Sequence, residues 1–232
     1  MEKLQIDIKP KLVSDYRKAP FDIAKKELES HKPRFLVCSI ADLTDLRLQE
    51  GSASDVSQEG SSVTSGILYI PIKYFSNGNL RNRAKLLPYS PIMHLPEKAT
   101  AAHRAGLEFC LMGNEFEKAM QESIDFPELY DDGRILGIPG IDLDSFEKEE
   151  FCIRMFEGVE RANAYRKFLV LKIKPAYKKL NKLPIWLLNE DYVNSQPYPF
   201  IRQVYFDCLD NGSAIVGKNI FLHHKNRVQG IS

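Results

Sequence analysis

The sequence has few cysteines and no long apolar run. The 232 residues include four cysteines, none of them in a CxxC pair, and each stands within an apolar segment. This pattern favours reduced, buried thiols over a disulfide framework. The N-terminal residues MEKLQIDIKPK lack the apolar stretch of about 7–15 residues that a secretory signal needs. No uncharged apolar stretch approaches the roughly 18 residues that span a bilayer. These absences predict a soluble, cytoplasmic protein that does not use a membrane.

The motifs of common nucleotide-dependent enzymes and hydrolases are absent too. The sequence contains no P-loop, GxGxxG, GxSxG or HExxH pattern. The pair His223-His224 offers a general acid or base, but adjacent residues on a strand point to opposite faces, so the pair is more typical of a strand end at the surface. The sequence thus predicts no cofactor and leaves open whether the protein is an enzyme.

Charge of either sign is not in excess over the whole chain. There are 32 Lys and Arg against 31 Asp and Glu, a net charge of +1, which excludes a uniformly basic or acidic protein. Hydrophobic residues make up 44 % of the chain, as is usual for globular proteins. These values predict a single domain over residues 1–232 with enough chain to bury a core.

Hydrophobic periodicity predicts an α+β fold with a mixed or antiparallel sheet of about seven strands and about three helices. Helices are expected over 20–30, 96–123 and 145–167. Among the expected strands, RFLVCSI (34–40) is apolar enough to be buried on both faces, and LTDLRL (43–48) and FLVLKIK (168–174) follow later in the chain. An order β-α-β-β-α-β with insertions is compatible with a ferredoxin-like core.

Two Asn-Gly pairs predict β-hairpins, because this dipeptide favours the tight turns that join antiparallel strands. Asn77-Gly78 separates ILYIPIKYF from LRNRAKLL, and Asn211-Gly212 separates FIRQVYFDCLD from SAIVGKNIFLHH. Pro71 cannot donate to a strand ladder, which places the first hairpin at a sheet edge. Residues 49–66 contain six serines and three glycines, a composition that predicts a flexible loop within the domain.

The charges are strongly segregated along the chain. Residues 107–160 hold fifteen Asp and Glu against four Lys and Arg, a local balance of −11. Residues 161–182 hold eight Lys and Arg and no acid, a balance of +8. Such a change of sign between adjacent segments indicates that the molecule is electrically polarised, although its net charge is close to zero.

The basic segments predict nucleic-acid binding, either to DNA or to RNA. Cations neutralise phosphates with release of counterions, and interleaved aromatic rings can stack on bases. In LRNRAK the three cations stand two residues apart and share one face if the segment is a strand. The alternatives are a plain solvated surface or docking onto an acidic partner. The predicted contacts are Arg81, Arg83, Lys85, Arg166, Lys167, Lys172, Lys174, Tyr177, Lys178 and Lys179.

Two other functions stay open from the sequence. The carboxylates of Asp142, Asp144 and Glu147 could bind Mg²⁺ or Mn²⁺ in a metal-dependent nuclease or other phosphodiesterase. The spacing of Asp144 and Glu147 also fits a capping box that begins a helix. In the remaining hypothesis, the acidic segment 107–160 recognises a basic protein or a second copy of the chain. The protein would then be an interaction or assembly subunit, or an inhibitor.

Overall fold

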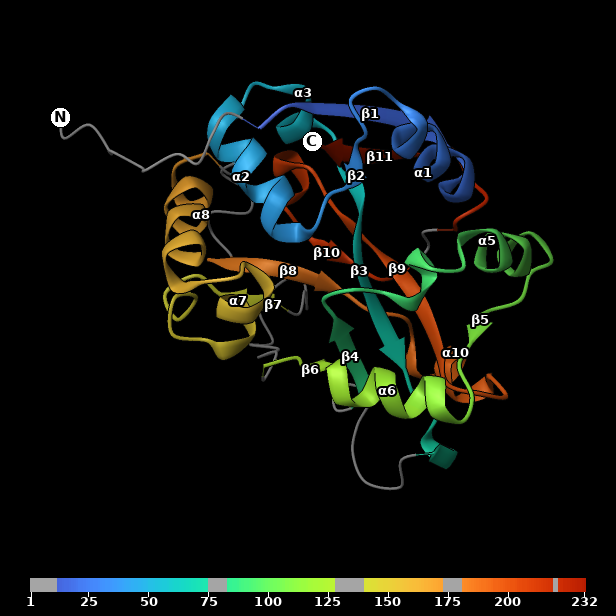
Figure 1. The fold of residues 1–232 in the computed structure, drawn as a ribbon. Helices are drawn as coiled ribbons and strands as arrows, with labels where there is room; N and C mark the ends of the chain where they lie inside the picture. The colour runs from blue at the N-terminus through green and yellow to red at the C-terminus, as the bar shows by residue number, and fades with distance from the viewer. Residues whose placement is uncertain (1–11, 75–82, 128–139, 173–180, 219–220) are drawn as a thin grey trace, which may run out of the picture.

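A computed structural model describes residues 12–74, 83–127, 140–172, 181–218 and 221–232 (Figure 1). Eleven strands of the described residues form one mixed sheet, with the central order β1-β11-β3-β9-β10-β8-β7. The strands are β1 (Ser14–Ala19), β2 (Leu36–Val37), β3 (Ser61–Tyr69), β4 (Ala84–Leu87), β5 (Phe109–Cys110), β6 (Ile124–Asp125), β7 (Gly140–Asp142), β8 (Lys182–Trp186), β9 (Phe200–Phe206), β10 (Ile215–Val216) and β11 (Asn226–Ile231).

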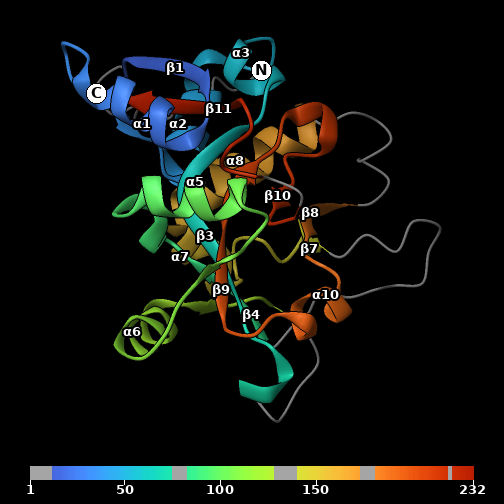
Figure 2. The same cartoon turned by 90° about the vertical axis from the view of Figure 1, so that its right-hand side faces the viewer.

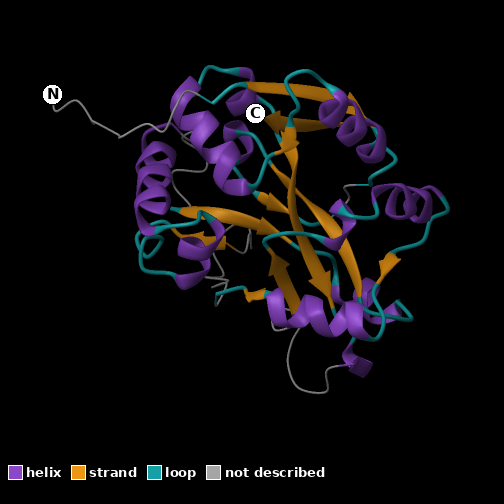
Figure 3. Cartoon of the chain, viewed as in Figure 1, coloured by secondary structure: helices purple, strands orange, loops and turns teal. Residues whose placement is uncertain are grey.

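Eight α-helices of the described residues surround this sheet (Figure 3). They are α1 (Phe21–Ser30), α2 (Ile40–Glu50), α3 (Asp55–Gln58), α5 (Pro96–Arg104), α6 (Asn114–Glu122), α7 (Glu150–Met155), α8 (Val159–Lys172) and α10 (Glu190–Ser195). Three short 3₁₀ helices are η1 (Ile72–Tyr74), η2 (Pro91–Met93) and η3 (Leu209–Asn211).

The first and last strands of the described chain pair with each other. β1 and β11 are antiparallel over six residue pairs, from Ser14 opposite Ile231 to Ala19 opposite Asn226. β11 then pairs with β3 in parallel, and β3 pairs with β9 and β4 in antiparallel fashion. The first and last described strands therefore lie side by side at one edge of the sheet.

Helices cover both faces of the central β3–β9 pair, which is why β3 is buried along all nine residues. Its side chains alternate between two cores, as the period of a strand requires. Val63, Ile67 and Tyr69 pack in the core that holds α2, α7 and α8, whereas Leu68 enters the core that holds α1 and α5. Figures 1 and 2 show these two helical groups on opposite sides of β3.

The expected ferredoxin-like core with about seven strands and three helices is wrong, although the α+β class and the mixed sheet agree with the structure. Residues 43–48 and 168–172, both expected as strands, lie in α2 and α8. In α8 the buried residues Ala162, Tyr165 and Leu169 are spaced by three and four, so a helix buries them on one side. Tertiary burial thus overrides the β-propensity of Val170 and its neighbours.

The serine-rich segment 49–66 is not a loop in the structure. It completes α2, forms α3 and begins the buried strand β3. The buried hydroxyls have partners: Ser61 Oγ accepts from the Gln229 backbone N–H at 2.9 Å, and Ser65 Oγ donates to the Pro88 carbonyl at 3.0 Å. Small residues also permit close packing, since a Cβ on Gly66 would lie 2.8 Å from Ser90 Oγ.

Both predicted hairpins pair as expected, but their surroundings differ. β3 and β4 are antiparallel, with Ile67 opposite Leu86; the turn at 77–78 lies outside the described residues. Because β3 stands between β11 and β9, the predicted edge position is wrong. In the second hairpin, β9 and β10 are joined through η3, and Gly212 takes the left-handed conformation that ends this turn (φ 73°).

Candidate functional site

The structure buries one predicted phosphate contact, Arg83, and pairs another, Lys85, with a carboxylate. Arg83 is fully buried: its guanidinium donates to the Ile70 carbonyl at 3.1 Å and to Asn194 Oδ1 at 2.7 Å, and it pairs with Glu190. Lys85, whose side chain is 12 % exposed, forms an ion pair with Asp125. Their predicted role as a free cationic row is therefore wrong, because Arg83 is buried and paired with Glu190, and Lys85 is paired with the exposed carboxylate of Asp125.

The remaining predicted cations do not join them. Arg166 donates to the Leu143 carbonyl and lies 3.5 Å from Asp144. Lys167 and Lys172 are exposed on α8, which lies apart from β4 in both views (Figures 1 and 2). The other predicted contacts, which are Arg81, Lys174, Tyr177, Lys178 and Lys179, lie outside the described residues.

The predicted carboxylate cluster is bridged by an amide. Asn181 Nδ2 donates to Asp142 Oδ1 at 3.2 Å and to Asp144 Oδ2 at 2.8 Å. The predicted capping box is wrong, because α7 begins only at Glu150, beyond Glu147. Within the described ranges, no three His, Cys, Asp or Glu side chains are grouped closely enough to hold a metal ion.

A different surface emerges from six large apolar side chains, each between 39 % and 64 % exposed. We call it the tyrosine surface; it consists of Ile72, Tyr74, Leu107, Met112, Tyr192 and Tyr198. It is formed by η1, the residues on either side of β5, α10 and the approach to β9. In Figure 1, β5 and α10 lie at the lower right, and Figure 2 shows α10 and α6 on opposite sides of β9.

Hydrogen bonds hold these segments side by side. Tyr74 Oη donates to the Pro197 carbonyl at 3.2 Å, and Asn194 Oδ1 accepts from the Ile72 N–H at 3.1 Å. On the other side, the Leu111 N–H donates to the Pro199 carbonyl at 2.8 Å, which continues the β5–β9 pairing. The exposed rings therefore stand on a fixed backbone, which reduces the entropy lost when a partner binds.

A buried polar network lies beneath the tyrosine surface. Arg202 Nε donates to Glu108 Oε2 at 3.0 Å, and Arg202 Nη2 pairs with Glu108 Oε1. Tyr192 Oη donates to the same Oε1 and accepts from Arg202 Nη2 at 3.3 Å. The network thus fixes the Tyr192 hydroxyl inside while its ring contributes to the surface.

His103 borders this network from α5. Its Nδ1 accepts from the Leu222 N–H at 3.2 Å, so Nε2 carries the proton of the neutral ring, and Nε2 lies 3.8 Å from Glu108 Oε2. Burial lowers the pKa of His103 to about 4, although Glu108 acts in the opposite direction. Burial and the adjacent Glu108 carboxylate together raise the pKa of Tyr192. At neutral pH both groups are uncharged.

Exposed carboxylates flank the tyrosine surface. Glu115 and Glu117 lie in the first turn of α6, just after Met112, and Asp191 precedes Tyr192 on α10. Within the described part of the chain, no Lys or Arg nitrogen lies within 4 Å of these three carboxylates. The segments of this surface thus carry these three carboxylates near its apolar side chains, together with the cation Lys73, whose Nζ lies 5.7 Å from the centre of the Tyr74 ring.

Sequence reasoning did not identify this surface. The segment NEDYVNSQPY (189–198) carried a usable signal, because Tyr, Ser and Asn are enriched in recognition loops. The members of the tyrosine surface come from segments more than a hundred residues apart, such as Tyr74 and Tyr198, which the hydrogen bond from Tyr74 to Pro197 joins. Only the antiparallel pairing of β3 with β9 brings them together.

Comparison with known proteins gives the fold. No family model matches the chain, and no curated protein matches it. It is similar to a solved structure described as "Accommodation of massive sequence variation in Nanoarchaeota by the C-type lectin fold", with a TM-score of 0.59 and 16 % sequence identity over 96 % of this chain and 98 % of that chain. This chain has the C-type lectin fold. The identity is too low to carry over more than the fold, and the function must be argued from the chain's own residues.

The search for membrane-spanning segments finds none in the described residues: no helix there combines the length and apolarity that crossing a bilayer requires. All four cysteines are free thiols, with Cys38 and Cys152 buried and Cys110 and Cys208 half-buried. Burial raises the pKa of each of the four thiols.

Proposed function

We propose that this protein is a binding module that recognises a basic protein partner through the tyrosine surface. The observation that carries the proposal is that three half-exposed tyrosines and three exposed aliphatic side chains stand on segments joined to one another by hydrogen bonds. Scattered single apolar residues need no explanation, but a contiguous group marks an interaction site. Tyrosine supplies large contact area at low conformational entropy and is enriched among residues that dominate binding energy.

The charges favour a basic partner. Glu115, Glu117 and Asp191 flank the apolar centre and have no cation within 4 Å in the described residues. Charge complementarity at a rim raises the association rate and selects among partners. This arrangement supports the sequence-based hypothesis of an acidic surface that recognises a basic protein, with the apolar tyrosine surface as the added centre.

The fold is compatible with such a role. The similar structure is described as accommodating massive sequence variation, which is a property of that protein. A scaffold whose strands and helices enclose two cores can vary its exposed side chains at little cost in stability. We therefore place recognition in the surface residues and stability in the sheet and its helices.

Nucleic-acid binding, divalent-metal nuclease activity and a cytoplasmic location stay predictions. Of the predicted phosphate contacts, Lys167 and Lys172 are the exposed ones within the described ranges. A test of the proposed function must therefore separate a protein partner from a nucleic acid.

The test uses affinity capture from nuclease-treated extract, with three forms of the full chain. The first is the wild type, the second is Tyr74→Ser/Tyr198→Ser, and the third is the matched control Ile23→Ser/Leu36→Ser, which alters two exposed apolar residues elsewhere. We expect a basic protein captured by the wild type and the control and lost from the tyrosine variant. With that protein purified, the tyrosine variant should bind about 30- to 1,000-fold more weakly, since each of the two lost hot spots costs about 1–2 kcal/mol.

Two results would overturn the proposal. In one, the captured proteins are the same for all three forms. In the other, no protein is captured from the nuclease-treated extract, and titration shows that RNA or DNA binding depends on Lys167 and Lys172. Thermal melting of each variant by circular dichroism checks that loss of binding is not loss of folding.

A further inference from the structure

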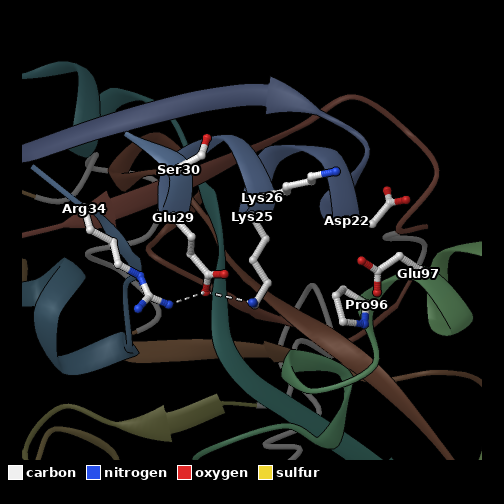
Figure 4. A pocket seen from close by; sticks show the side chains of 8 residues that line it. All are labelled: Asp22, Lys25, Lys26, Glu29, Ser30, Arg34, Pro96 and Glu97. Atoms are coloured by element: carbon white, nitrogen blue, oxygen red, sulfur yellow. Dashed lines mark hydrogen bonds and ion pairs between the residues drawn. The ribbon is translucent and has the colours of Figure 1, made fainter. Parts of the chain in front are cut away.

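A pocket of about 460 Å³ lies between α1 and the start of α5, separate from the tyrosine surface (Figure 4). This volume falls in the range of roughly 300–1,000 Å³ that is typical of small-molecule sites. Its lining is almost entirely charged, with three cations and three carboxylates. The pocket therefore suits a charged ligand rather than an apolar one.

One face of α1 forms the long wall of the pocket. Asp22, Lys25, Lys26 and Glu29 are spaced by three and four residues, so they share this face. The opposite face, through Phe21, Ala24 and Leu28, is buried in the core. The charged wall is thus anchored by the packing of the helix behind it.

The end of the pocket near Arg34 is cationic. Lys25 Nζ lies 2.7 Å from Glu29 Oε1, and Arg34 Nη2 lies 3.8 Å from the same oxygen. Figure 4 shows both cations directed at Glu29 from opposite sides. Two positive charges share one carboxylate, which leaves one net positive charge at this end.

The other end of the pocket is acidic. Figure 4 shows the carboxylates of Asp22 and Glu97 at the end away from Arg34. Neither has a Lys or Arg nitrogen within 4 Å among the described residues, and this includes Lys26 on the same face. Asp22 Oδ1 is buried without a hydrogen-bond donor. Asp22 as a whole is only half-buried and Glu97 is exposed, so a ligand ammonium can approach the accessible parts of these two carboxylates.

We propose that this pocket binds a short zwitterionic peptide, with its ammonium at Asp22 and Glu97 and its carboxylate at Lys25 and Arg34. The spacing selects the length. Asp22 and Glu29 are seven residues apart on α1, which corresponds to about 10 Å along the helix axis. An extended chain of three residues spans about 10 Å, whereas a single amino acid separates its charges by only about 3 Å.

Isothermal titration calorimetry with triglycine tests this proposal. Three related probes test separately the ammonium contact, the carboxylate contact and the spacing between them. N-acetyl-triglycine lacks the ammonium, triglycine amide lacks the carboxylate, and glycine has both charges at the wrong spacing. We expect triglycine to bind at millimolar concentration. Each modified tripeptide should bind about 5-fold more weakly, as expected for one lost exposed ion pair, and glycine should bind no better than they do.

Site variants identify the acidic end. Asp22→Asn/Glu97→Gln should weaken triglycine binding about 5-fold, as much as N-acetylation does, because both changes remove the same ion pair, and the variant should bind triglycine amide no more strongly than N-acetyl-triglycine. The matched control is Glu27→Gln, which alters an exposed carboxylate on α1 outside the pocket. The proposal is overturned if triglycine does not bind, if blocking either terminus has no effect, or if the control weakens binding as much as the double variant. None of these measurements depends on the tyrosine surface.

Discussion

Arg47 and Arg202 are both buried, at 0 % and 2 % exposure, and each guanidinium lies over a phenylalanine ring, at 4.7 Å from Phe206 and 4.8 Å from Phe221. Their hydrogen-bond partners differ in kind. Arg202 pairs with the Glu108 carboxylate. Arg47 donates only to neutral oxygens, at distances of 2.7–2.9 Å: the carbonyls of Val56 and Asp207 and the hydroxyls of Tyr165 and Ser213.

This difference corresponds to two tasks. The partners of Arg47 belong to α3, α8 and the turn between β9 and β10, so this side chain joins four parts of the fold at one point. The partners of Arg202 connect it to the surface of the protein. Tyr192 also binds the Glu108 carboxylate, and this tyrosine is 39 % exposed. We infer that the Arg47 site serves stability alone, whereas the Arg202 site also positions a residue of the tyrosine surface.

The largest expected effect comes from Arg47→Met, which keeps most of the side-chain volume and removes all four hydrogen bonds. Several buried acceptors lose their donor together, so the free energy of unfolding should fall by about 4 kcal/mol. Urea denaturation measures this, with the exposed Arg154→Met as the control. A loss below about 1 kcal/mol would contradict a structural role for Arg47.

Glu108→Gln should have the next largest effect. It leaves the buried Arg202 without a counter-charge, which should cost about 3 kcal/mol of stability, since breaking a buried ion pair on one side is strongly destabilising. The double variant Glu108→Leu/Arg202→Met removes both charges and should be more stable than Glu108→Gln alone. If urea denaturation shows the double variant to be the less stable of the two, an unpaired buried charge is not what destabilises Glu108→Gln.

The Arg202 site should also respond to pH. The folded state keeps His103 neutral down to about pH 4, whereas the unfolded chain binds a proton near pH 6.5. The unfolded state therefore holds more protons between these values, and stability falls as the pH is lowered from 6.5 to 4, by roughly 2–3 kcal/mol. In the variant His103→Asn, the introduced amide side chain can still accept from the Leu222 N–H but does not titrate. The free energy of unfolding of this variant should therefore lack this part of the dependence on pH. Equal slopes for both proteins in urea denaturation at pH 7, 5.5 and 4.5 would contradict the prediction.

The smallest effect separates the two sites most clearly. Tyr192→Phe and Tyr165→Phe each remove one hydroxyl from an arginine site, and each should cost about 1 kcal/mol of stability. Tyr192→Phe should in addition weaken binding of the basic partner several-fold, because its ring is no longer held. Tyr165→Phe should leave the affinity unchanged. The same affinity for both variants would show that the network beneath Tyr192 does not position the surface.

Local features of the fold could be predicted from the sequence. The expected helix over 20–30 is α1, and both Asn-Gly hairpins contain paired strands. These predictions succeeded because proline fixes its own backbone angle and Asn-Gly favours tight turns, and both effects act within a few residues. The strands expected at 43–48 and over the described part of 168–174 failed because short apolar runs fit either period, and packing against other segments decided between them.

For the charged residues of the candidate site, too, contacts between distant segments decided what the local sequence could not. The sequence by itself determined how many charges there are and that acids and bases are segregated along the chain. Only the tertiary structure decided which of them meet solvent. Arg83 has partners 13, 107 and 111 residues away, so no local pattern could reveal that its charge is satisfied internally. A buried arginine needs several acceptors at fixed positions, and those positions exist only when distant strands and helices have come together.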